Sequence, residues 1–403
     1  MTSKCFLLAI NGGSSSIKFA IFELTKKLCP LLTGEICDIG SDKVSFLTHH
    51  EDKTKNISKM IGGADYKSAI NILIDWLKEF TKDKQIVAVG HRIVFGGHRY
   101  SNPQQITSEL LEELRQFSSI DLNHLPAQIL LVEAMSDMFS HQPQIACFDT
   151  FFHRDMPAIA QLLPIPRRYF DKGIRRYGFH GLSCEYLIKA LTELDGNHVA
   201  NGHVILAHLG SGVSVTAVHN GKCVDTSMSL TPCSGLPMAT RSGDVDPGLF
   251  FYLAQTESMN SIQINNMMNC ESGLKGISET TGNIRSLLKL QATNKYAADA
   301  VNLFCYQIKK YICMMAGAMG GVTTLVFSGG IGENSPEIRA RICEKLGFIG
   351  IHIDSEKNTA NSHIISTPTS EVLIRIIQTN EELVIAQHIY DILNEQKFGN
   401  CEF

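Results

Sequence analysis

The sequence predicts an α/β fold shared between two domains, and three observations support this prediction. The chain has 403 residues, and about 100–200 residues per domain is typical of globular proteins. Short apolar runs typical of strands alternate with helical patterns, which favours layers of sheet and helix. A pattern that begins at Leu8 returns at Leu206, and such a repeat indicates a duplicated core.

The strands are predicted from short apolar runs that are bounded by glycine or polar residues. In chain order these runs are Cys5–Ile10, Ile17–Phe22, Ile86–Val89, Gln144–Phe148, Val204–His208, Val213–Val218 and Thr324–Phe327. A helix is predicted over Ala300–Ala316, because Val301, Phe304 and Ile308 recur on one face.

Composition narrows the class of protein. Hydrophobic residues make up 44% of the chain and the net charge is -4 at pH 7, which does not favour binding to nucleic acid or to an anionic membrane. The 12 cysteines include no C-x-x-C pair, so free thiols in a reducing compartment are expected. The uncharged stretch Tyr311–Gly332 is interrupted by glycines and is interpreted as a buried helix end and strand, with a membrane span as the alternative. We therefore expect a cytoplasmic protein without a nucleic-acid or membrane partner.

The repeat places a glycine- and serine-rich turn in each copy. Leu8–Lys18 and Leu206–Thr216 both have the order strand, turn, strand. Glycines let backbone N–H groups approach an anion, and serine hydroxyls add hydrogen-bond donors. Lys18 adds a positive charge beyond the first turn, although the spacing is not that of a P-loop. The turns predict phosphate binding, with two plain hairpins as the alternative.

A third glycine-rich segment, Ser328–Pro336, follows a predicted strand. Ser335 suits the N-cap of a helix and Pro336 its first position. A glycine loop that leads into a helix suits a nucleotide phosphate, and an ordinary strand–helix connection is the alternative. Together the three segments resemble the fold of actin, the seventy-kilodalton chaperones, sugar kinases and acetate kinases. That resemblance implies two duplicated ribonuclease-H-like domains of the actin-like ATPase superfamily, with an interdomain ATP cleft.

Arginines and histidines in predicted loops indicate which of these protein families the chain resembles. With them, the chain resembles the acetate kinases over nearly its whole length. The segments that carry the resemblance, in the order of the family, are Ile10–Lys18, His91–Gly97, Phe148–His153, Arg175–Gly181, His208–Gly212, Asp225–Met228, Thr240–Pro247, Phe327–Asn334 and Thr379–Gln387.

The resemblance implies a role for each matching residue. Arg92 and Arg241 would bind the carboxylate and the transferring phosphoryl group, and His180 would stabilise the transition state. Asn11 and Glu381 would hold or orient Mg²⁺, for which Mn²⁺ could substitute.

Further matching positions imply the two substrate pockets. Val94, Phe179 and Pro232 match the walls of the acyl pocket, beside Arg92. The positions that match nucleotide contacts are Lys18, His208, Leu209, Gly210, Ser211, Gly212, Asn283, Ile284, Arg285, Gly330, Ile331, Gly332, Glu333 and Asn334.

Two acidic positions need a separate argument. Asp149 matches the catalytic aspartate of the family, but a carboxylate substrate is already ionised at pH 7 and needs no strong base. We therefore expect Asp149 to orient Arg92 or Arg241, or to hold a magnesium-bound water. Thr379 and Glu382 have the spacing of a capping box, which predicts a structural Glu382.

The resemblance implies reversible, Mg²⁺-dependent transfer of the ATP γ-phosphoryl group to acetate, giving acetyl phosphate and ADP, by a homodimer that associates through the second domain. Ser211 and Asn283 depart from the usual Asn and Asp of the family, so nucleotide affinity stays open. The expected domains are 1–150 with a returning helix in 381–403, and 151–380, which would bind nucleotide. A propionate or butyrate kinase, or a non-catalytic actin- or chaperone-like nucleotide-binding protein, are the alternatives.

Overall fold

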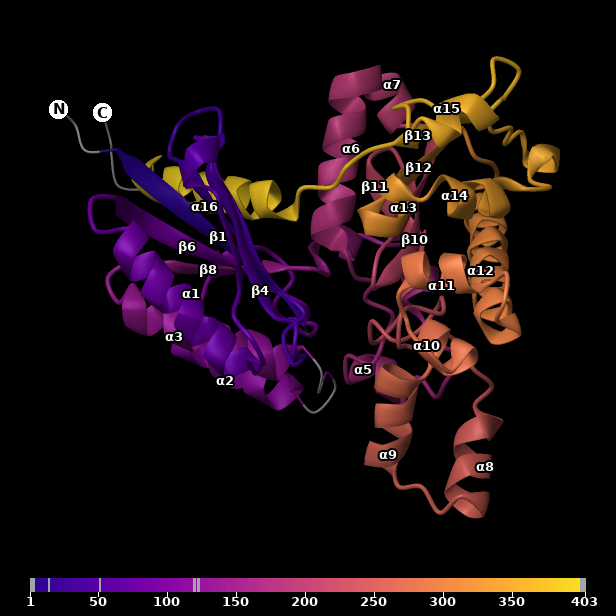
Figure 1. Ribbon diagram of the computed structural model, residues 1–403, viewed down its shortest axis with the longest axis horizontal. Helices are drawn as coiled ribbons and strands as arrows, with labels where there is room; N and C mark the ends of the chain where they lie inside the picture. The colour runs from indigo at the N-terminus through magenta and orange to yellow at the C-terminus, as the bar shows by residue number, and fades with distance from the viewer. Residues whose placement is uncertain (1–3, 14, 51, 119–120, 122–123, 399–403) are drawn as a thin grey trace. The chain divides into compact units, whose positions relative to one another are not determined.

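The chain divides into two compact units in the computed structural model shown in Figure 1, which describes residues 4–13, 15–50, 52–118, 121 and 124–398. Unit 1 comprises Met1–Phe151 and Asn380–Phe403, and unit 2 comprises Phe152–Thr379. Each unit contains a mixed sheet with helices packed on it. The predicted α/β fold is confirmed.

Unit 1 is built on an eight-stranded sheet in the order β5-β4-β3-β2-β1-β6-β8-β7. Strands β5 to β1 pair antiparallel, whereas β1, β6 and β8 run parallel. The strand bounds are β1 Cys5–Gly12, β2 Ile17–Glu23, β3 Pro30–Cys37, β4 Ser45–His50, β5 Ile57–Met60, β6 Gln85–Ile93, β7 Gln104–Gln105 and β8 Gln144–Phe148.

Helices cover both faces of this sheet, so β1 is buried along almost its whole length. Helices α1 (Tyr66–Phe80), α2 (Ser108–Phe117) and α3 (Leu125–Met138) lie on one side, and α16 (Glu381–Phe398) lies on the other (Figure 1). Gly90 on β6 allows α16 to approach closely, because an added β-carbon would lie 2.6 Å from the side chain of Ile385. A segment near the C-terminus thus completes the core that the N-terminal strands begin.

Unit 2 repeats the same strand order. Its sheet is β11-β10-β9-β12-β13, in which β9 pairs antiparallel with β10 and parallel with β12. This matches β3-β2-β1-β6-β8 in both order and direction. The predicted duplication is therefore confirmed. The bounds are β9 His203–Leu209, β10 Val213–His219, β11 Lys222–Thr226, β12 Thr324–Ser328 and β13 Leu373–Ile376.

Two long helices pack on this second sheet. Leu187 and Leu191 of α6 (Gly181–Asp195) form a core cluster with Leu206 and Val326 of the strands. Helix α12 (Lys295–Met319) includes the predicted helix and lies on the other side in Figure 1. The shorter helices are α4 Ala158–Gln161, α5 Arg168–Asp171, α7 Asn197–Ala200, α8 Gly248–Thr256, α9 Ser261–Asn266, α10 Gly273–Ser278, α11 Ile284–Leu290, α13 Gly329–Asn334, α14 Pro336–Cys343 and α15 Ser355–Thr359.

The prediction of a glycine loop after β12 is wrong, because Gly329–Asn334 form the short helix α13. A wholly buried arginine, Arg339, stabilises the end of this helix by donating to the carbonyls of Gly332 and Glu333 at 2.8 and 3.1 Å. Pro336 does begin the next helix, but Ser335 makes no capping bond through its side chain. Burial lowers the pKa of Arg339 to about 10.

The uncharged stretch contains the end of α12 and strand β12, as the sequence predicts. Within the residues that the structure describes, no helix combines the length and the apolar character needed to cross a membrane.

Candidate active site

Unit 1 gathers polar side chains at the carboxyl ends of its three parallel strands. Asn11 lies near the end of β1, Arg92 near the end of β6, and Asp149 directly follows β8. The N-terminus of α16 adds Glu381 and Glu382. We call these five residues the ionic cluster. Ligands of α/β proteins commonly bind outside this edge of a sheet.

Arg92 is the centre of the ionic cluster. It donates to Asp149 Oδ2 at 2.5 Å and to Asn11 Oδ1 at 3.1 Å. Asp149 is fully buried, while the Arg92 side chain is 15% exposed. Burial alone would lower the pKa of Arg92, but Asp149 and Glu381 outweigh it and raise this pKa above its ordinary value. Arg92 Nε is buried and has no hydrogen-bond partner among the described residues.

The predicted capping box at α16 is wrong. Asn380 accepts from the backbone N–H of Leu383 at 3.0 Å, whereas the hydroxyl of Thr379 lies 2.9 Å from Ser183 Oγ. Glu382 is therefore free to join the ionic cluster. Asn11 Nδ2 donates to Glu381 at 2.8 Å and to Glu382 at 3.0 Å.

The side-chain oxygens of Glu381, Glu382 and Asn11 suit a divalent metal ion. Burial, and then the neighbouring Glu381, raise the pKa of Glu382, which indicates negative charge that lacks full compensation. Mg²⁺ prefers oxygen ligands and usually uses one or two carboxylates together with water and substrate phosphates. In the described part of the chain, no three His, Cys, Asp or Glu residues are arranged to hold a metal by themselves. Glu381, Glu382 and Asn11 are thus the residues that would contribute to such a site.

Lys18 lies next to this cluster in the sheet, since it pairs with Asn11 on β1 and with Glu35 on β3. Burial lowers its pKa, but Glu35, Glu382 and Glu381 outweigh that effect and raise it. Lys18 therefore stays charged at neutral pH, as a phosphate contact requires.

Unit 2 carries a different group, which we call the imidazole pair: His180 and His208. Their ring centroids lie 4.4 Å apart. His180 Nδ1 lies 2.9 Å from Ser214 Oγ, and His208 Nδ1 lies 2.8 Å from Ser183 Oγ. Two imidazolium ions at this distance would repel each other by about 4 kcal/mol at an effective dielectric constant of 20. The short distance between the rings therefore disfavours a state in which both are charged.

The backbone around His180 is held in an unusual conformation. His180 has φ +58° at the N-cap of α6, a region that non-glycine residues seldom adopt. The preceding carbonyl, of Phe179, lies 2.9 Å from Nε2 of His153. Burial lowers the pKa of His153 to about 4, so this ring is neutral and can donate that bond.

Arg241 lies beside the imidazole pair. An added β-carbon on Gly212 would lie 3.0 Å from His180 Nε2 and 3.7 Å from Arg241 Nη1. Glycine at this position therefore leaves room between a histidine and an arginine. Arg241 Nη1 also donates to the carbonyl of Pro232 at 3.0 Å.

The predicted nucleotide residues of unit 2 lie close together, although not all of their side chains are available. The turn His208–Gly212 contacts α13, since an added β-carbon on Gly329 would lie 2.7 Å from the carbonyl oxygen of Leu209. The carbonyl of Ser211 accepts from Ala239 N at 3.2 Å. A β-carbon on Gly282 would in turn lie 2.4 Å from the carbonyl oxygen of Ala239, next to the segment Asn283–Arg285.

Several of these side chains have structural partners instead. Glu333 accepts from the backbone N–H groups of Gly329 and Thr379 at 2.9 and 3.2 Å. Asn334 donates to the carbonyl of Gly330 at 3.0 Å, and Asn283 caps α11 by accepting from Ser286 N at 3.1 Å. Ile284 is buried, and Ile331 and Gly332 belong to α13.

The predicted acyl-pocket residues are all buried. Val94 follows β6 in unit 1, and its backbone N–H donates to Gln128 Oε1 at 2.9 Å. Phe179 and Pro232 belong to unit 2, where their carbonyls bind His153 and Arg241.

Sequence reasoning missed several residues of these groups. Gln128 links Val94 to the first turn, since its Nε2 donates to the carbonyl of Gly12 at 2.9 Å. The Tyr66 hydroxyl is buried beside Gly12 without a hydrogen-bond partner among the described residues. Ser183 and Ser214 support the imidazole pair. Both serines lay near quoted motifs, because Ser183 is three residues after His180 and Ser214 is within the repeat Leu206–Thr216.

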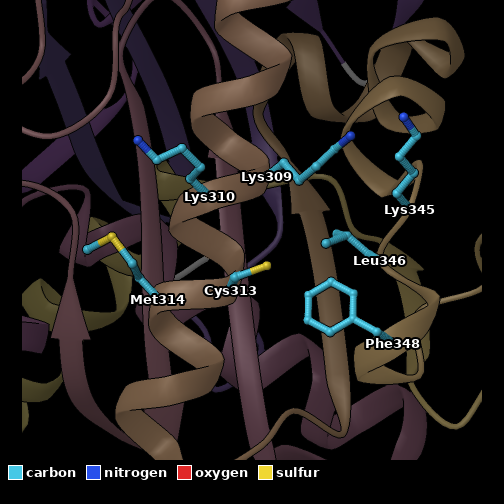
Figure 2. A pocket seen from close by; sticks show the side chains of 7 residues that line it. All are labelled: Lys309, Lys310, Cys313, Met314, Lys345, Leu346 and Phe348. Atoms are coloured by element: carbon cyan, nitrogen blue, oxygen red, sulfur yellow. The ribbon is translucent and has the colours of Figure 1, made fainter.

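A hollow elsewhere in unit 2 contains none of the predicted site residues. It has a volume of about 460 Å³ and lies between α12 and the segment after α14 (Figure 2). Its lining residues are Lys309, Lys310, Cys313, Met314, Lys345, Leu346 and Phe348.

Comparison with known proteins finds acetate kinases that are similar over nearly the whole chain. The acetokinase family profile matches residues 6–387. An acetate kinase of Clostridium novyi (strain NT) is 39% identical over 399 residues, covering 96% of this chain and 98% of that protein. An acetate kinase of Rhodopseudomonas palustris (strain ATCC BAA-98 / CGA009) is 37% identical over 391 residues, covering 95% of this chain and 97% of that protein.

Solved structures agree in fold. A propionate kinase from Francisella tularensis subsp. tularensis SCHU S4 has a TM-score of 0.86 at 36% identity, covering 96% of this chain and 99% of that one. An acetate kinase from Porphyromonas gingivalis has a TM-score of 0.81 at 33% identity, covering 97% of this chain and 100% of that one. By sequence and fold, this chain belongs to the acetokinase family.

Proposed function

We propose that this chain transfers the γ-phosphoryl group of ATP to acetate, reversibly, giving acetyl phosphate and ADP. The observation that carries this proposal is the ionic cluster, in which Arg92 has a buried Nε without a partner among the described residues. A buried donor of this kind calls for an acceptor. A planar carboxylate suits a guanidinium group particularly well.

In unit 1, Arg92 binds the acetate carboxylate through its uncommitted nitrogen. The ion pair with Asp149 fixes the guanidinium orientation, which makes Asp149 a positioning residue and not a general base. Mg²⁺ held by Glu381, Glu382 and Asn11 would neutralise the charge of the ATP phosphates. This charge neutralisation matters because phosphoryl transfer depends mostly on positioning and electrostatic stabilisation.

In unit 2, Arg241 and His180 stabilise the phosphoryl group during transfer. Their nitrogens both lie near Gly212, where an oxygen of the phosphoryl group could accept from both. Donors that are fixed before the reaction need no rearrangement as charge develops. The turn His208–Gly212 and helix α13 bind the nucleotide through backbone groups, because the Glu333 and Asn334 side chains are already hydrogen-bonded.

Val94, which is buried in unit 1, limits the length of the acyl group. A valine at position 94 favours acetate over longer acids, and one methylene in an apolar pocket is worth about 1–3 kcal/mol. Propionate is the second candidate substrate, because the similar Francisella tularensis structure is a propionate kinase.

We further propose a cytoplasmic homodimer that associates through unit 2, the unit that also binds nucleotide. Exposed apolar side chains gather on α8 and α9, where Phe251, Tyr252 and Ile262 are 71%, 56% and 70% exposed. Large exposed apolar side chains commonly mark protein interfaces.

A hydroxamate assay tests the proposed function. Purified protein would be incubated with ATP, Mg²⁺ and one of acetate, propionate or butyrate, and acyl phosphate would be trapped with hydroxylamine. We expect product with acetate, about tenfold less efficiently with propionate, and still less with butyrate. No product with any acid would refute the proposal. A preference for propionate would identify propionate, in place of acetate, as the substrate.

A further inference from the structure

Two buried hydroxyl groups each contact one ring of the imidazole pair. Ser214 lies on β10 and is 1% exposed, and Ser183 lies in the first turn of α6 and is 0% exposed. Both hydroxyls lie within 3 Å of Nδ1, and neither lies at Nε2. The same nitrogen of each ring is therefore occupied by a hydroxyl from a different element.

The proton positions follow from the number of partners that each hydroxyl has. Among the described residues, the Ser214 hydroxyl has His180 Nδ1 as its hydrogen-bond partner. Since Ser214 is almost fully buried, its O–H satisfies its hydrogen bond by donating to that nitrogen. A neutral imidazole that accepts at Nδ1 carries its proton on Nε2.

His208 Nδ1 also contacts a serine hydroxyl, and that serine has a second hydroxyl partner. Ser183 Oγ lies 2.8 Å from His208 Nδ1 and 2.9 Å from Thr379 Oγ1. If Thr379 donates to Ser183 and Ser183 donates to His208, both hydroxyl protons in this series of hydrogen bonds are used. In the opposite direction, the Thr379 proton would need an acceptor outside the described contacts.

The two Nε2 atoms face the glycine turn. An added β-carbon on Gly212 would lie 3.0 Å from His180 Nε2, and one on Gly210 would lie 3.8 Å from His208 Nε2. A protonated Nε2 can donate to an anion at this turn, whereas a lone pair there would repel it. The Nδ1 contacts therefore determine what the turn can bind.

We propose that Ser214 and Ser183 are positioning residues that hold His180 and His208 as neutral imidazoles protonated on Nε2, so that both rings donate toward the turn Gly210–Gly212. Thr379 supports Ser183 in this role. The chemical reason is that two neutral donors can bind a phosphate oxygen without the repulsion between two imidazolium ions. The proposal deepens the proposed function and rests on it for the identity of the anion.

Nuclear magnetic resonance tests the proton positions without an activity assay. The protein would be labelled with ¹⁵N in its histidines and measured at pH 8, with His180 and His208 identified from the spectra of His180→Gln and His208→Gln. We expect both rings to carry the proton on Nε2. Ser214→Ala should shift His180 toward a mixture of tautomers, and Ser183→Ala should do the same for His208. Protonation on Nδ1 in the wild type, or unchanged tautomers in both variants, would overturn the proposal.

Kinetics give the second test. We expect Ser214→Ala to lower kcat about tenfold, and Ser183→Ala to raise the KM for ATP about tenfold, as the loss of one aligned donor predicts. Thr192→Val is the matched control, because the Thr192 hydroxyl on α6 donates to the helix carbonyl of Ile188 at 2.9 Å. This control should match wild type in both kinetics and tautomers.

Thr379 provides a variant outside the buried core, in case the serine variants fail to fold. Thr379→Val keeps the shape and removes the hydroxyl, whereas Thr379→Ser keeps the hydroxyl. We expect the valine variant to raise the KM for ATP about threefold and the serine variant to match wild type. Equal effects of the two would contradict the proposal. A wild-type protein that makes no acyl phosphate would refute the proposed function but leave the tautomer measurement valid.

Discussion

The ionic cluster of unit 1 and the imidazole pair of unit 2 occupy related places in a duplicated core but differ in charge. In unit 1 a partly buried arginine and a fully buried aspartate form an ion pair at 2.5 Å, with two further carboxylates close by. In unit 2 two neighbouring imidazoles, tilted by 31° relative to each other, are held by neutral hydroxyls. In the proposed mechanism, the first cluster binds through full charges, and the second through the placement of protons.

The repeat shows how the two copies diverged. In the sequence repeat, Asn11 near the end of β1 aligns with Leu209 at the end of β9. Lys18 pairs with Asn11 across the first hairpin, whereas Val213 pairs with Leu209 across the second. His208 corresponds to Ile10, which is buried in the first core. One strand framework therefore supports a cation and carboxylates in one unit, and hydrogen-bond donors in the other. Substitutions in the two units should consequently affect different kinetic constants.

The largest effect is expected in unit 2, from Arg241→Ala. This change removes a charged donor that acts mainly in the transition state, at a cost of about 3 kcal/mol or about a hundredfold in kcat. Steady-state kinetics with acetate and ATP measure it, with Arg285→Ala on the exposed side of α11 as a comparison for general loss of nucleotide binding. A kcat within about twofold of wild type would remove Arg241 from the mechanism.

The matching change in unit 1, Arg92→Ala, should act on binding and on stability. We expect the KM for acetate to rise about tenfold or more, because the carboxylate loses its guanidinium partner. Removing one member of a buried ion pair also costs about 3–5 kcal/mol, since Asp149 loses its cation. Denaturant unfolding measures this loss, and Arg92→Ala/Asp149→Asn should recover part of it. An unchanged KM for acetate together with unchanged stability would contradict the role of the ionic cluster.

Val94→Ala should change substrate choice without affecting the nucleotide. The smaller side chain would narrow or invert the preference for acetate over propionate, which we expect to be about tenfold in kcat/KM for the wild type. The KM for ATP should change little. The ratio of kcat/KM for the two acids measures the effect, and an unchanged ratio would remove Val94 from the acyl pocket.

Glu382→Gln separates metal binding from folding. Because burial and Glu381 raise the pKa of Glu382, ionisation of Glu382 opposes folding at neutral pH. The neutral variant should therefore be more stable without ligands, while its KM for Mg²⁺ rises about tenfold.

The same residue predicts a pH dependence. As the pH falls, Glu382 becomes protonated at a higher pH than an ordinary glutamate, so the wild-type KM for Mg²⁺ should rise. This rise should be smaller in Glu382→Gln. If the variant kept wild-type Mg²⁺ dependence at all pH values, Glu382 would have no part in metal binding.

The smallest effect is expected from Ser211→Asn, which restores the usual family residue of the second turn. The longer side chain can reach a phosphate that serine would contact only through water. We expect the KM for ATP to stay the same or to fall about threefold at most. A large loss of activity would show that this turn is arranged differently from that of its relatives.

Regular elements were predictable from local pattern alone, and contacts between distant segments were not. Strand β8 has the predicted bounds, because all five of its residues are buried. The prediction of a capping box at α16 was wrong because the Thr379 hydroxyl contacts Ser183, which is 196 positions away in the chain. The prediction of a glycine loop after β12 was wrong because Arg339, on the following helix, stabilises helix α13 there. The role of Ser214 was not predicted, because its contact with His180 joins strand β10 to the start of α6, 34 positions away in the chain.

Carboxylate-dependent ADP release tests most directly whether this chain transfers a phosphoryl group from ATP to acetate. ADP and acyl phosphate would be measured in the same reactions, with and without acetate, for the wild type and Arg92→Ala. The proposed mechanism predicts that acetate stimulates ADP release, that acetyl phosphate forms in equal amount, and that Arg92→Ala needs far more acetate for the same rate. ADP release that is independent of acetate, with no acetyl phosphate, would contradict it and favour a nucleotide-binding protein of the actin or chaperone type.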